Sequence, residues 1–328
     1  MYSVARTTVY LSKGYLENTD IVNMPYMNPE AGDELVVRVT SKHPELGVFV
    51  MTPNGHSGLI RPKELAWNNQ SKFFDVIKVG ELINARVQQV LQDGKINFSR
   101  KALLPNPEEI ELGTIMDGVV DSVADYGVFV RFDGFIALAP WQELSSRFYS
   151  KGDSIKCVFK DRVYDDRNRV KVTLSVLPFH KYFADHHTIG ERLFLSYVGK
   201  NQNDSYLAAV VSVDGLFLYD INAKKLDDET KADLSSGDLY KGDELEVEFT
   251  SFSESKCFIN FDMRPIQRER EKQKIDQLHS QLSKGDVVVA EVKRVGIRDA
   301  HIQIAGTDFL IPIKREELSP NKVLRASD

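Results

Sequence analysis

The chain has 328 residues and a formal net charge of −6, and 42% of its residues are hydrophobic. This length exceeds one typical domain of about 100–150 residues, so we expect two to four domains. No apolar run approaches the ~20 residues that span a membrane, and the N-terminus lacks the basic start and apolar core of a secretory signal, so we expect a cytoplasmic protein without membrane contact.

Residues 1–31 precede any repeated pattern. Residues 7–11 have the composition of a strand, and residues 23–29 are rich in turn-forming residues. We expect an N-terminal arm that packs on the first domain or on a partner.

The phrase Gly-Val-Phe-Val occurs at residues 47–50 and again at 127–130. Each copy follows a glycine-led strand and precedes an apolar turn ending in Glu-Leu, a second glycine-led strand and a closing strand. A fixed order of weak signals that repeats along a chain determines the architecture before any single motif does. The pattern predicts repeat one at 32–103, repeat two at 113–177 and a more divergent repeat three at 190–264.

Each repeat is about 65–75 residues long and is expected to hold five short strands. Small all-β units of this kind protect their sheet edges by closing into a barrel. We therefore predict an all-β fold of tandem five-stranded barrels with short helices in the connections.

The connections differ in character. Pro105 and Pro107 stiffen the first linker. Residues 265–284 are charged, with Ile275, Leu278 and Leu282 at helical spacing, which predicts an amphipathic helical linker. Residues 285–328 begin a fourth repeat and stop before its last two strands, so we expect the native chain to continue or this unit to complete itself on another repeat.

The order Gly…Asp-Tyr-Gly-Val-Phe-Val…Glu-Leu…Lys-Gly-Asp…Leu-Ser within residues 113–175 resembles the RNA-binding repeat of ribosomal protein S-one. Repeat one resembles it well and repeat three weakly. The resemblance implies oligonucleotide-binding-fold (OB) barrels, which also occur in exoribonucleases and translation factors. It implies capture of single-stranded RNA, with mRNA expected, in translation or its regulation.

Strand alternation predicts which residues of repeat two face outward. Val128 and Val130 share one side of their strand, and Phe129 and Arg131 share the other. A phenylalanine in a strand is more often core, but the flanking valines and the resemblance favour an outward Phe129. The resemblance implies that Tyr126 and Phe129 stack on bases.

Repeat one keeps Phe49 but has Leu46 in place of the first aromatic residue. The family's histidine on the third strand is replaced by Arg61 in repeat one and by Pro140, next to Trp141, in repeat two. The expected basic contacts to RNA, including those on the closing strands, are Arg38, Arg61, Lys95, Arg131 and Lys171. For any one of these residues taken singly, a solvated surface charge is the default interpretation.

The charge is distributed unevenly among the repeats. Repeat one has ten Lys and Arg against seven Asp and Glu, repeat two has nine against nine, and repeat three has eight against fifteen. Because phosphate binding requires cations, we expect RNA on repeats one and two. Repeat three, which retains only Leu216-Phe217-Leu218 of the phrase, is expected to be a spacer or a protein-docking module.

Rival functions have less support. No phosphate-binding loop, nucleophile elbow or His-Glu-x-x-His motif occurs, so we expect no enzyme, no catalytic residue and no cofactor. His186 and His187 lack a third ligand nearby, so no metal site is expected. Cys157 and Cys257 lie in apolar segments, as expected for buried free thiols. The remaining alternative is a scaffold whose degenerate barrels dock on the ribosome or the transcription machinery.

Overall fold

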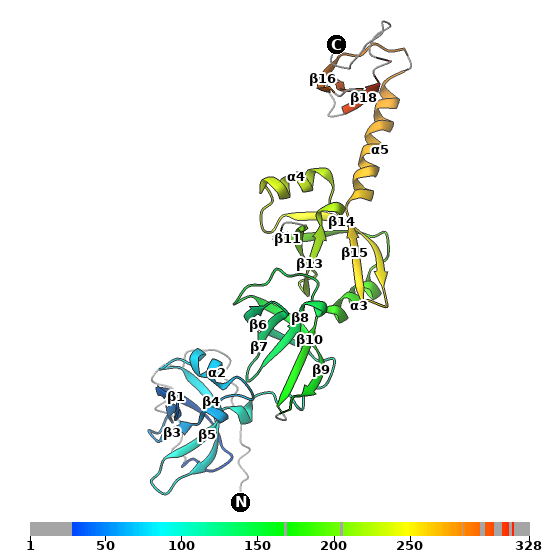
Figure 1. Ribbon diagram of the computed structural model, residues 1–328. Helices are drawn as coiled ribbons and strands as arrows, with labels where there is room; N and C mark the ends of the chain where they lie inside the picture. Colours follow the sequence, from blue (N-terminus) through cyan, green and yellow to red (C-terminus); the bar gives the residue numbers. More distant parts are fainter. Residues whose placement is uncertain are drawn as a thin grey trace, which may run out of the picture. The chain divides into compact units, whose positions relative to one another are not determined.

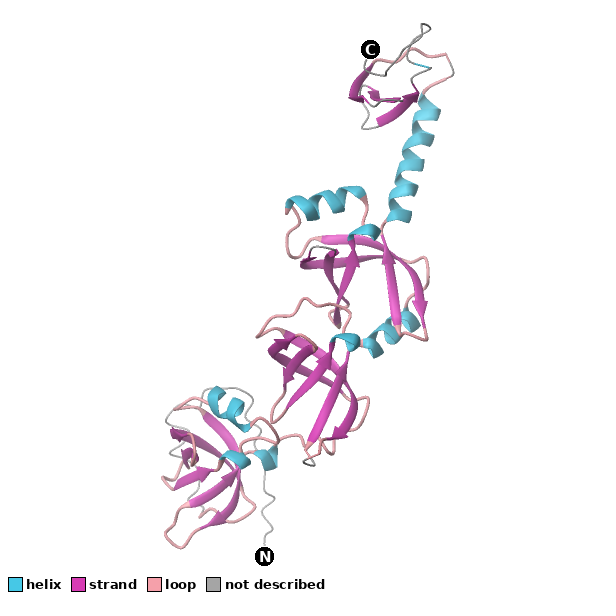
Figure 2. Cartoon of the chain, viewed as in Figure 1, coloured by secondary structure: helices cyan, strands magenta, loops and turns pink. Residues whose placement is uncertain are grey.

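The computed structural model divides into two compact units, Met1–Arg264 and Pro265–Asp328, which are described separately. The structure describes residues 28–166, 169–203, 206–283, 285–295, 299–304, 310–314 and 317. The predicted N-terminal arm lies outside the described residues as far as residue 27, and so does the end of the predicted fourth repeat, residues 318–328. Within these limits the predicted all-β class is confirmed, with helices confined to connections (Figure 2).

Repeat one is a closed barrel with the strand order β1-β2-β3-β5-β4 (Figure 1). Antiparallel ladders join β1 to β2 and to β4, and parallel pairing of β3 with β5 closes the barrel. The strands are β1 (Glu34–His43), β2 (Gly47–Met51), β3 (Ser57–Ile60), β4 (Leu82–Val90) and β5 (Ile96–Ser99). The connections contain 3₁₀ turns at Pro62–Glu64 and Lys101–Leu103 and the helix α2 (Gln70–Val76).

Repeat two is a second closed barrel, with the corresponding order β10-β8-β7-β6-β9. Its parallel closure pairs Thr173 with Leu138. The strands are β6 (Ile115–Ala124), β7 (Gly127–Arg131), β8 (Ile136–Pro140), β9 (Ser154–Tyr164) and β10 (Val170–Ser175). A 3₁₀ turn (Trp141–Glu143) follows β8, and helix α3 (Leu177–His186) leads to repeat three.

Repeat three is a five-stranded sheet in the order β13-β12-β11-β14-β15. Its strands are β11 (Arg192–Asn203), β12 (Tyr206–Val213), β13 (Phe217–Asn222), β14 (Glu244–Ser253) and β15 (Phe258–Asp262). A 3₁₀ turn (Ala223–Lys225) and helix α4 (Asp228–Ser236) lie between β13 and β14. The retained Phe217 and Leu218 belong to the third strand of this repeat, so they are not a remnant of the phrase, which lies on the second strand in repeats one and two.

The glycine that opens each Gly-Val-Phe-Val phrase lies where two backbones approach closely. A Cβ atom at Gly47 would lie 2.1 Å from the carbonyl oxygen of Ile60 on β3. A Cβ atom at Gly127 would lie 2.4 Å from that of Ala139 on β8. Gly47 also has a φ of +118°, which disfavours any side chain. The glycine is therefore required by the packing of strand two against strand three, independently of any ligand.

The Glu-Leu pair after the third strand ties that strand to the end of the barrel. The carbonyl of Glu64 accepts a hydrogen bond from the amide of Arg100 at 3.0 Å. The carbonyl of Glu143 accepts one from the amide of Val176 at 2.9 Å. The leucine that follows each glutamate is buried. This explains why Glu-Leu recurs at a fixed place in the sequence pattern.

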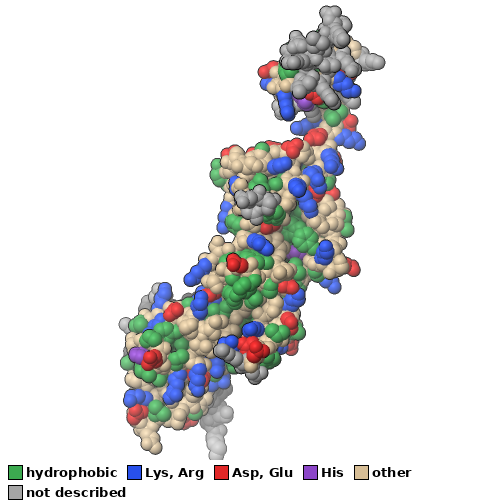
Figure 3. Space-filling view, in the orientation of Figure 1, with side chains coloured by type: hydrophobic (Ala, Val, Ile, Leu, Met, Phe, Trp, Pro, Cys, Tyr) green, Lys and Arg blue, Asp and Glu red, His purple; other side chains and the backbone are tan. Residues whose placement is uncertain are grey.

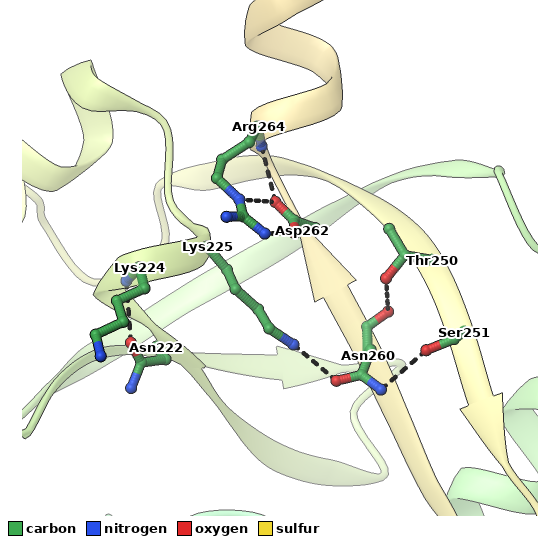
Figure 4. A network of polar contacts seen from close by, with 8 residues as sticks. All are labelled: Asn222, Lys224, Lys225, Thr250, Ser251, Asn260, Asp262 and Arg264. Atoms are coloured by element: carbon green, nitrogen blue, oxygen red, sulfur yellow. Dashed lines mark hydrogen bonds and ion pairs between the residues drawn. The ribbon is translucent and has the colours of Figure 1, made fainter.

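Repeat three makes the same connection with a lysine. The carbonyl of Lys225 accepts from the amide of Met263 at 2.8 Å, and its Nζ donates to Asn260 Oδ1 at 2.7 Å. Asn260 Nδ2 in turn donates to Ser251 Oγ at 2.9 Å, so the network reaches from the 3₁₀ turn across β15 to β14 (Figure 4). Side chains therefore bridge the edge that backbone pairing closes in the other repeats.

The second unit contains most of helix α5 (Arg264–Gln281) and a three-stranded antiparallel sheet, β16 (Ala290–Val295), β17 (Asp299–Ile304) and β18 (Leu310–Lys314). The helix confirms the predicted helical linker, but Ile275 on its predicted apolar side is 46% exposed. The side chain of Leu278 is outside the described residues.

Cys157 and Cys257 are free thiols, the first buried and the second half-buried, and burial raises the pKa of Cys157 to about 12. None of the described helices is both long and apolar enough to cross a bilayer.

Candidate nucleic-acid interface

The second strand of repeat one exposes one side to solvent. Val48 and Val50 point into the core, and Phe49 and Met51 point outward, half-buried and exposed respectively. Cross-strand pairing places Phe49 between Ser41 and Leu59 and places Met51 between Arg38 and Ser57. We call the surface formed by Arg38, Ser41, Phe49, Met51, Ser57 and Leu59 the outer face of repeat one.

Two of the predicted cations at this face are unpaired. Arg38 on β1 and Arg61, immediately after β3, are exposed and form no hydrogen bond or ion pair through their guanidinium groups within the described part of the chain. Arg61 lies beyond the end of the third strand rather than on it. Lysine and arginine side chains lie among apolar ones over repeat one, at the lower left of Figure 3. An apolar centre with flanking free cations suits a base stack with flanking phosphates.

Two other basic residues of repeat one are neutralised locally. Lys95 lies in the turn before β5 rather than on the closing strand, and its Nζ is 2.8 Å from Asp93 Oδ2. The hydrogen bond to Asp93 raises the pKa of Lys95. Arg86 on β4 pairs with Glu34 at 2.7 Å. Both cations therefore contribute less positive field than Arg38 and Arg61.

Repeat two presents the predicted aromatic pair. Phe129 lies between Ser122 and Leu138, and Tyr126 meets its ring edge-on with centroids 5.9 Å apart. Tyr126 is 58% exposed, but Phe129 is only partly so. The sheet thus turns Phe129 outward, as strand alternation predicts, and a contact of either ring with RNA stays a prediction.

The other candidates in repeat two differ in accessibility. Arg131 is half-buried between Val119 and Ile136, and Lys171 is exposed on β10. Pro140 is the last residue of β8, and Trp141 beside it donates its indole N–H to the carbonyls of Ala124 and Asp125. The Trp141 indole N–H is therefore already used within the barrel.

A segment of repeat one, residues 66–73, lies on the outward surface of repeat two. Asn68 Nδ2 donates to the carbonyl of Ile136 at 3.0 Å, and its Oδ1 accepts from the amide of the same residue at 2.8 Å. Lys72 Nζ is 2.9 Å from the buried carboxylate of Asp121. Phe129 packs against the small apolar cluster that Ala66, Phe73 and Ile136 form. We call residues 66–73 the covering segment.

Repeat three is covered in the same way by repeat two. In each repeat the first strand contains a β-bulge where it pairs with the second strand. The second-strand residue that pairs just after this bulge is Phe49 in repeat one, Phe129 in repeat two and Val210 in repeat three, so the three positions are equivalent. Val210 is fully buried. Ser145 Oγ donates to the carbonyl of Leu218 on β13 at 2.7 Å, and the ring of Phe148 occupies the space above Gly199.

The junction between repeats two and three also buries a carboxylate. Asp220 accepts from Asn201 Nδ2 at 2.7 Å, its second oxygen has no hydrogen-bond partner among the described residues, and burial raises its pKa. Asp220 pairs across the sheet with Val210, and an acid at this place opposes phosphate binding. That repeat three is a spacer or a protein-docking module stays a prediction.

The histidine pair in the linker has local partners. His187 Nδ1 is 3.1 Å from Glu191 Oε1, and His186 Nδ1 is 2.7 Å from the carbonyl of Tyr182. Across the described ranges no group of three or more potential metal ligands comes together.

Comparisons with known proteins are consistent with this geometry. Residues 28–101 match the family model described as S1 RNA binding domain. The small ribosomal subunit protein bS1 of Rhodopseudomonas palustris is 24% identical over 92% of this chain and 54% of its own length. A polyribonucleotide nucleotidyltransferase of Desulfosudis oleivorans is 40% identical, over 25% of this chain and 11% of that protein.

Among solved structures, a multidomain protein with nucleic acid binding domains from Streptococcus pneumoniae is 13% identical and covers 71% of this chain and 73% of its own, with a TM-score of 0.23. A TM-score this low carries no argument about function. The chain spans about half the length of the bS1 relatives that it matches. The chain therefore carries an S1 RNA-binding domain at residues 28–101 and is homologous over most of its length to bacterial ribosomal protein bS1.

Proposed function

We propose that the chain binds single-stranded RNA on the outer face of repeat one and acts by binding rather than catalysis. The observation that carries this proposal is that no hydrogen bond, ion pair or apolar cluster among the described residues joins this face to another repeat, whereas the equivalent faces of repeats two and three are covered. The face also holds the unpaired Arg38, with the unpaired Arg61 beside it.

In this mechanism a base stacks on Phe49, with Met51 and Leu59 extending the apolar surface, and Arg38 and Arg61 neutralise phosphates on either side. Stacking on Phe49 and neutralisation of phosphates are available to every nucleotide, so recognition tolerates sequence differences. The homology to bS1 supports a cytoplasmic role in translation or its regulation with mRNA as the ligand, and association with the ribosome.

Substitution of Phe49 tests the proposal. We expect Phe49→Ala to weaken binding of a fluorescently labelled single-stranded RNA by about 1–3 kcal/mol, roughly 5-fold to 150-fold, because a base–aromatic stack is lost. The measurement is fluorescence anisotropy, with the thermal unfolding midpoint of each variant recorded to show that the barrel remains folded.

The matched control is Phe129→Ala, at the equivalent but covered position of repeat two, which should leave the affinity unchanged. Phe49→Trp should retain binding because it keeps a stacking ring. Absence of RNA binding by the unmodified protein, or an affinity in Phe49→Ala equal to that of the unmodified protein, would refute the proposal. A protein-docking scaffold would then be the better interpretation.

A further inference from the structure

We propose that repeat two carries a second single-stranded RNA site that the covering segment of repeat one keeps closed, so that RNA enters it only when the two repeats separate. This inference rests on the proposed function, because it assumes that the chain binds RNA at all. It differs in placing a latent site on a different repeat and in naming the contacts that close it.

The contacts of the covering segment coincide with the surface that RNA would need. Phe129 is equivalent to the Phe49 of the proposed open site, and it is the residue that packs beneath Ala66 and Phe73. The Asn68 side chain forms hydrogen bonds with both the amide and the carbonyl of Ile136, and Ile136 pairs across the sheet with Arg131. A base stacked on Phe129 and the covering segment therefore compete for the same space.

The junction between repeats two and three is a docked surface without the features of an RNA site. On repeat three the position equivalent to Phe129 is Val210, and the donor repeat supplies the aromatic ring, Phe148, over Gly199. A carboxylate, Asp220, is buried there. Repeat three has thus lost the features of an RNA platform, and it keeps only docking features.

Repeat two has kept those features although docking does not use them. Tyr126 is 58% exposed and lies edge-on to Phe129. The guanidinium of Arg131 and the ammonium of Lys171 have no ion pair within the described residues. An exposed tyrosine and two unpaired cations contribute nothing to the contact with repeat one, and they suit a nucleic-acid strand.

The cover is held by one small apolar cluster, Ala66, Phe73 and Ile136, and by a few polar contacts. Relative motion of domains is the default expectation where the interface between them is neither large nor strongly hydrophobic. The polar contacts include the two Asn68 hydrogen bonds, the Lys72–Asp121 ion pair, and a hydrogen bond of 2.7 Å from the Trp67 amide to the carbonyl of Gly134. Near them, Arg100 Nη2 of repeat one is 3.7 Å from Asp133 Oδ1 of repeat two. The apparent affinity of the latent site is its intrinsic affinity reduced by the separated fraction. Weakening the cover must therefore raise that affinity.

The test uses the full chain with the double substitution Asn68→Ala/Lys72→Glu, which removes both side-chain hydrogen bonds and places a negative charge against Asp121. The control, Asn84→Ala/Lys78→Glu, makes the same change in composition and charge at exposed positions of repeat one that form no side-chain contact with repeat two. Separation is followed by hydrogen exchange of the Trp67 amide, whose bond to the Gly134 carbonyl crosses the junction and is untouched by the substitutions. RNA binding is followed by calorimetry with an oligouridine of about six nucleotides, close to the site size of one OB fold.

The expected result is faster exchange of the Trp67 amide and a rise in stoichiometry from one to two RNA molecules per chain in the double variant only. Adding Phe129→Ala to it should abolish the second site and leave the first. The proposal is overturned if the Trp67 amide exchanges no faster, since these contacts would then not hold the cover, or if exchange accelerates and the stoichiometry stays at one. Failure of the unmodified chain to bind RNA would instead refute the proposed function.

Discussion

Arg38 and Arg86 show how the partner of a single side chain determines its value for RNA binding. Both arginines lie on strands of repeat one, and both are candidates by charge alone. Arg38 has no anionic partner within the described residues, whereas Arg86 Nη2 is 2.7 Å from Glu34 Oε1. A phosphate approaching Arg86 must compete with a carboxylate already in place.

We therefore predict that Arg38→Ala weakens RNA binding about fivefold, close to 1 kcal/mol, and that Arg86→Ala changes it less than twofold. Anisotropy titrations at low salt compare the two variants directly. Neither substitution should alter the free energy of unfolding by more than a few tenths of a kcal/mol, because the Arg86 ion pair is solvent-exposed and such pairs stabilise little. Equal losses of affinity in both variants would show that charge, not placement, governs binding.

At the scale of elements, helix α3 contains a buried histidine that links stability to pH. His180 is completely buried against Phe217, Tyr219 and Phe258. Its Nδ1 is 3.0 Å from the carbonyl of Cys257, and its Nε2 has no hydrogen-bond partner within the described part of the chain. Burial disfavours the imidazolium and lowers the pKa to about 4. In the folded protein the ring is therefore neutral, with Nδ1–H as the donor.

This pKa predicts a loss of stability on mild acidification. An unfolded chain protonates His180 near pH 6.5 and the folded chain near pH 4, so between these values the unfolded state binds more protons. The contribution of the neutral His180 to the free energy of unfolding is complete above about pH 6.5. It falls by up to about 3 kcal/mol as the pH approaches 4. Urea unfolding followed at near-neutral pH and at about pH 5 measures this slope.

His180→Phe should keep the packing and flatten the slope, whereas His186→Phe, at the exposed end of the same helix, should not. A slope that is unchanged in His180→Phe would place the acid sensitivity elsewhere.

The elements also show what sequence reasoning reaches and what it misses. Repetition predicts the barrels because the Gly-Val-Phe-Val and Glu-Leu signals arise from backbone contacts that every copy must make, as at Gly47 and Glu64. Strand alternation likewise predicts that Phe49 and Phe129 turn outward. Neither rule detects the cover over Phe129, because Asn68 binds the main chain of Ile136, which any residue there would supply. Contacts between repeats therefore leave little trace in the sequence of either repeat.

At the scale of the whole molecule, the net charge of −6 is unfavourable for a nucleic-acid binder. The docking of repeats lessens this repulsion of phosphates, because it covers the face of the most acidic repeat. The excess of acidic over basic residues is largest in repeat three, with fifteen against eight, and the equivalent face of that repeat is covered by repeat two. The open face lies on repeat one, where Lys and Arg exceed Asp and Glu by three. Binding to the intact chain should consequently rely on few cations and largely on stacking.

The salt dependence of RNA binding measures that number of cations. If only Arg38 and Arg61 neutralise phosphates, the slope of log K against log salt should be about −1.4, since each neutralised phosphate of a single strand contributes about −0.7. The double variant Arg38→Ala/Arg61→Ala should bring the slope close to zero while Phe49 still supports weak binding. A slope steeper than about −3 in the unmodified chain would mean that at least four cations engage RNA. The covered face of repeat two, with Arg131 and Lys171, would then already be open in solution.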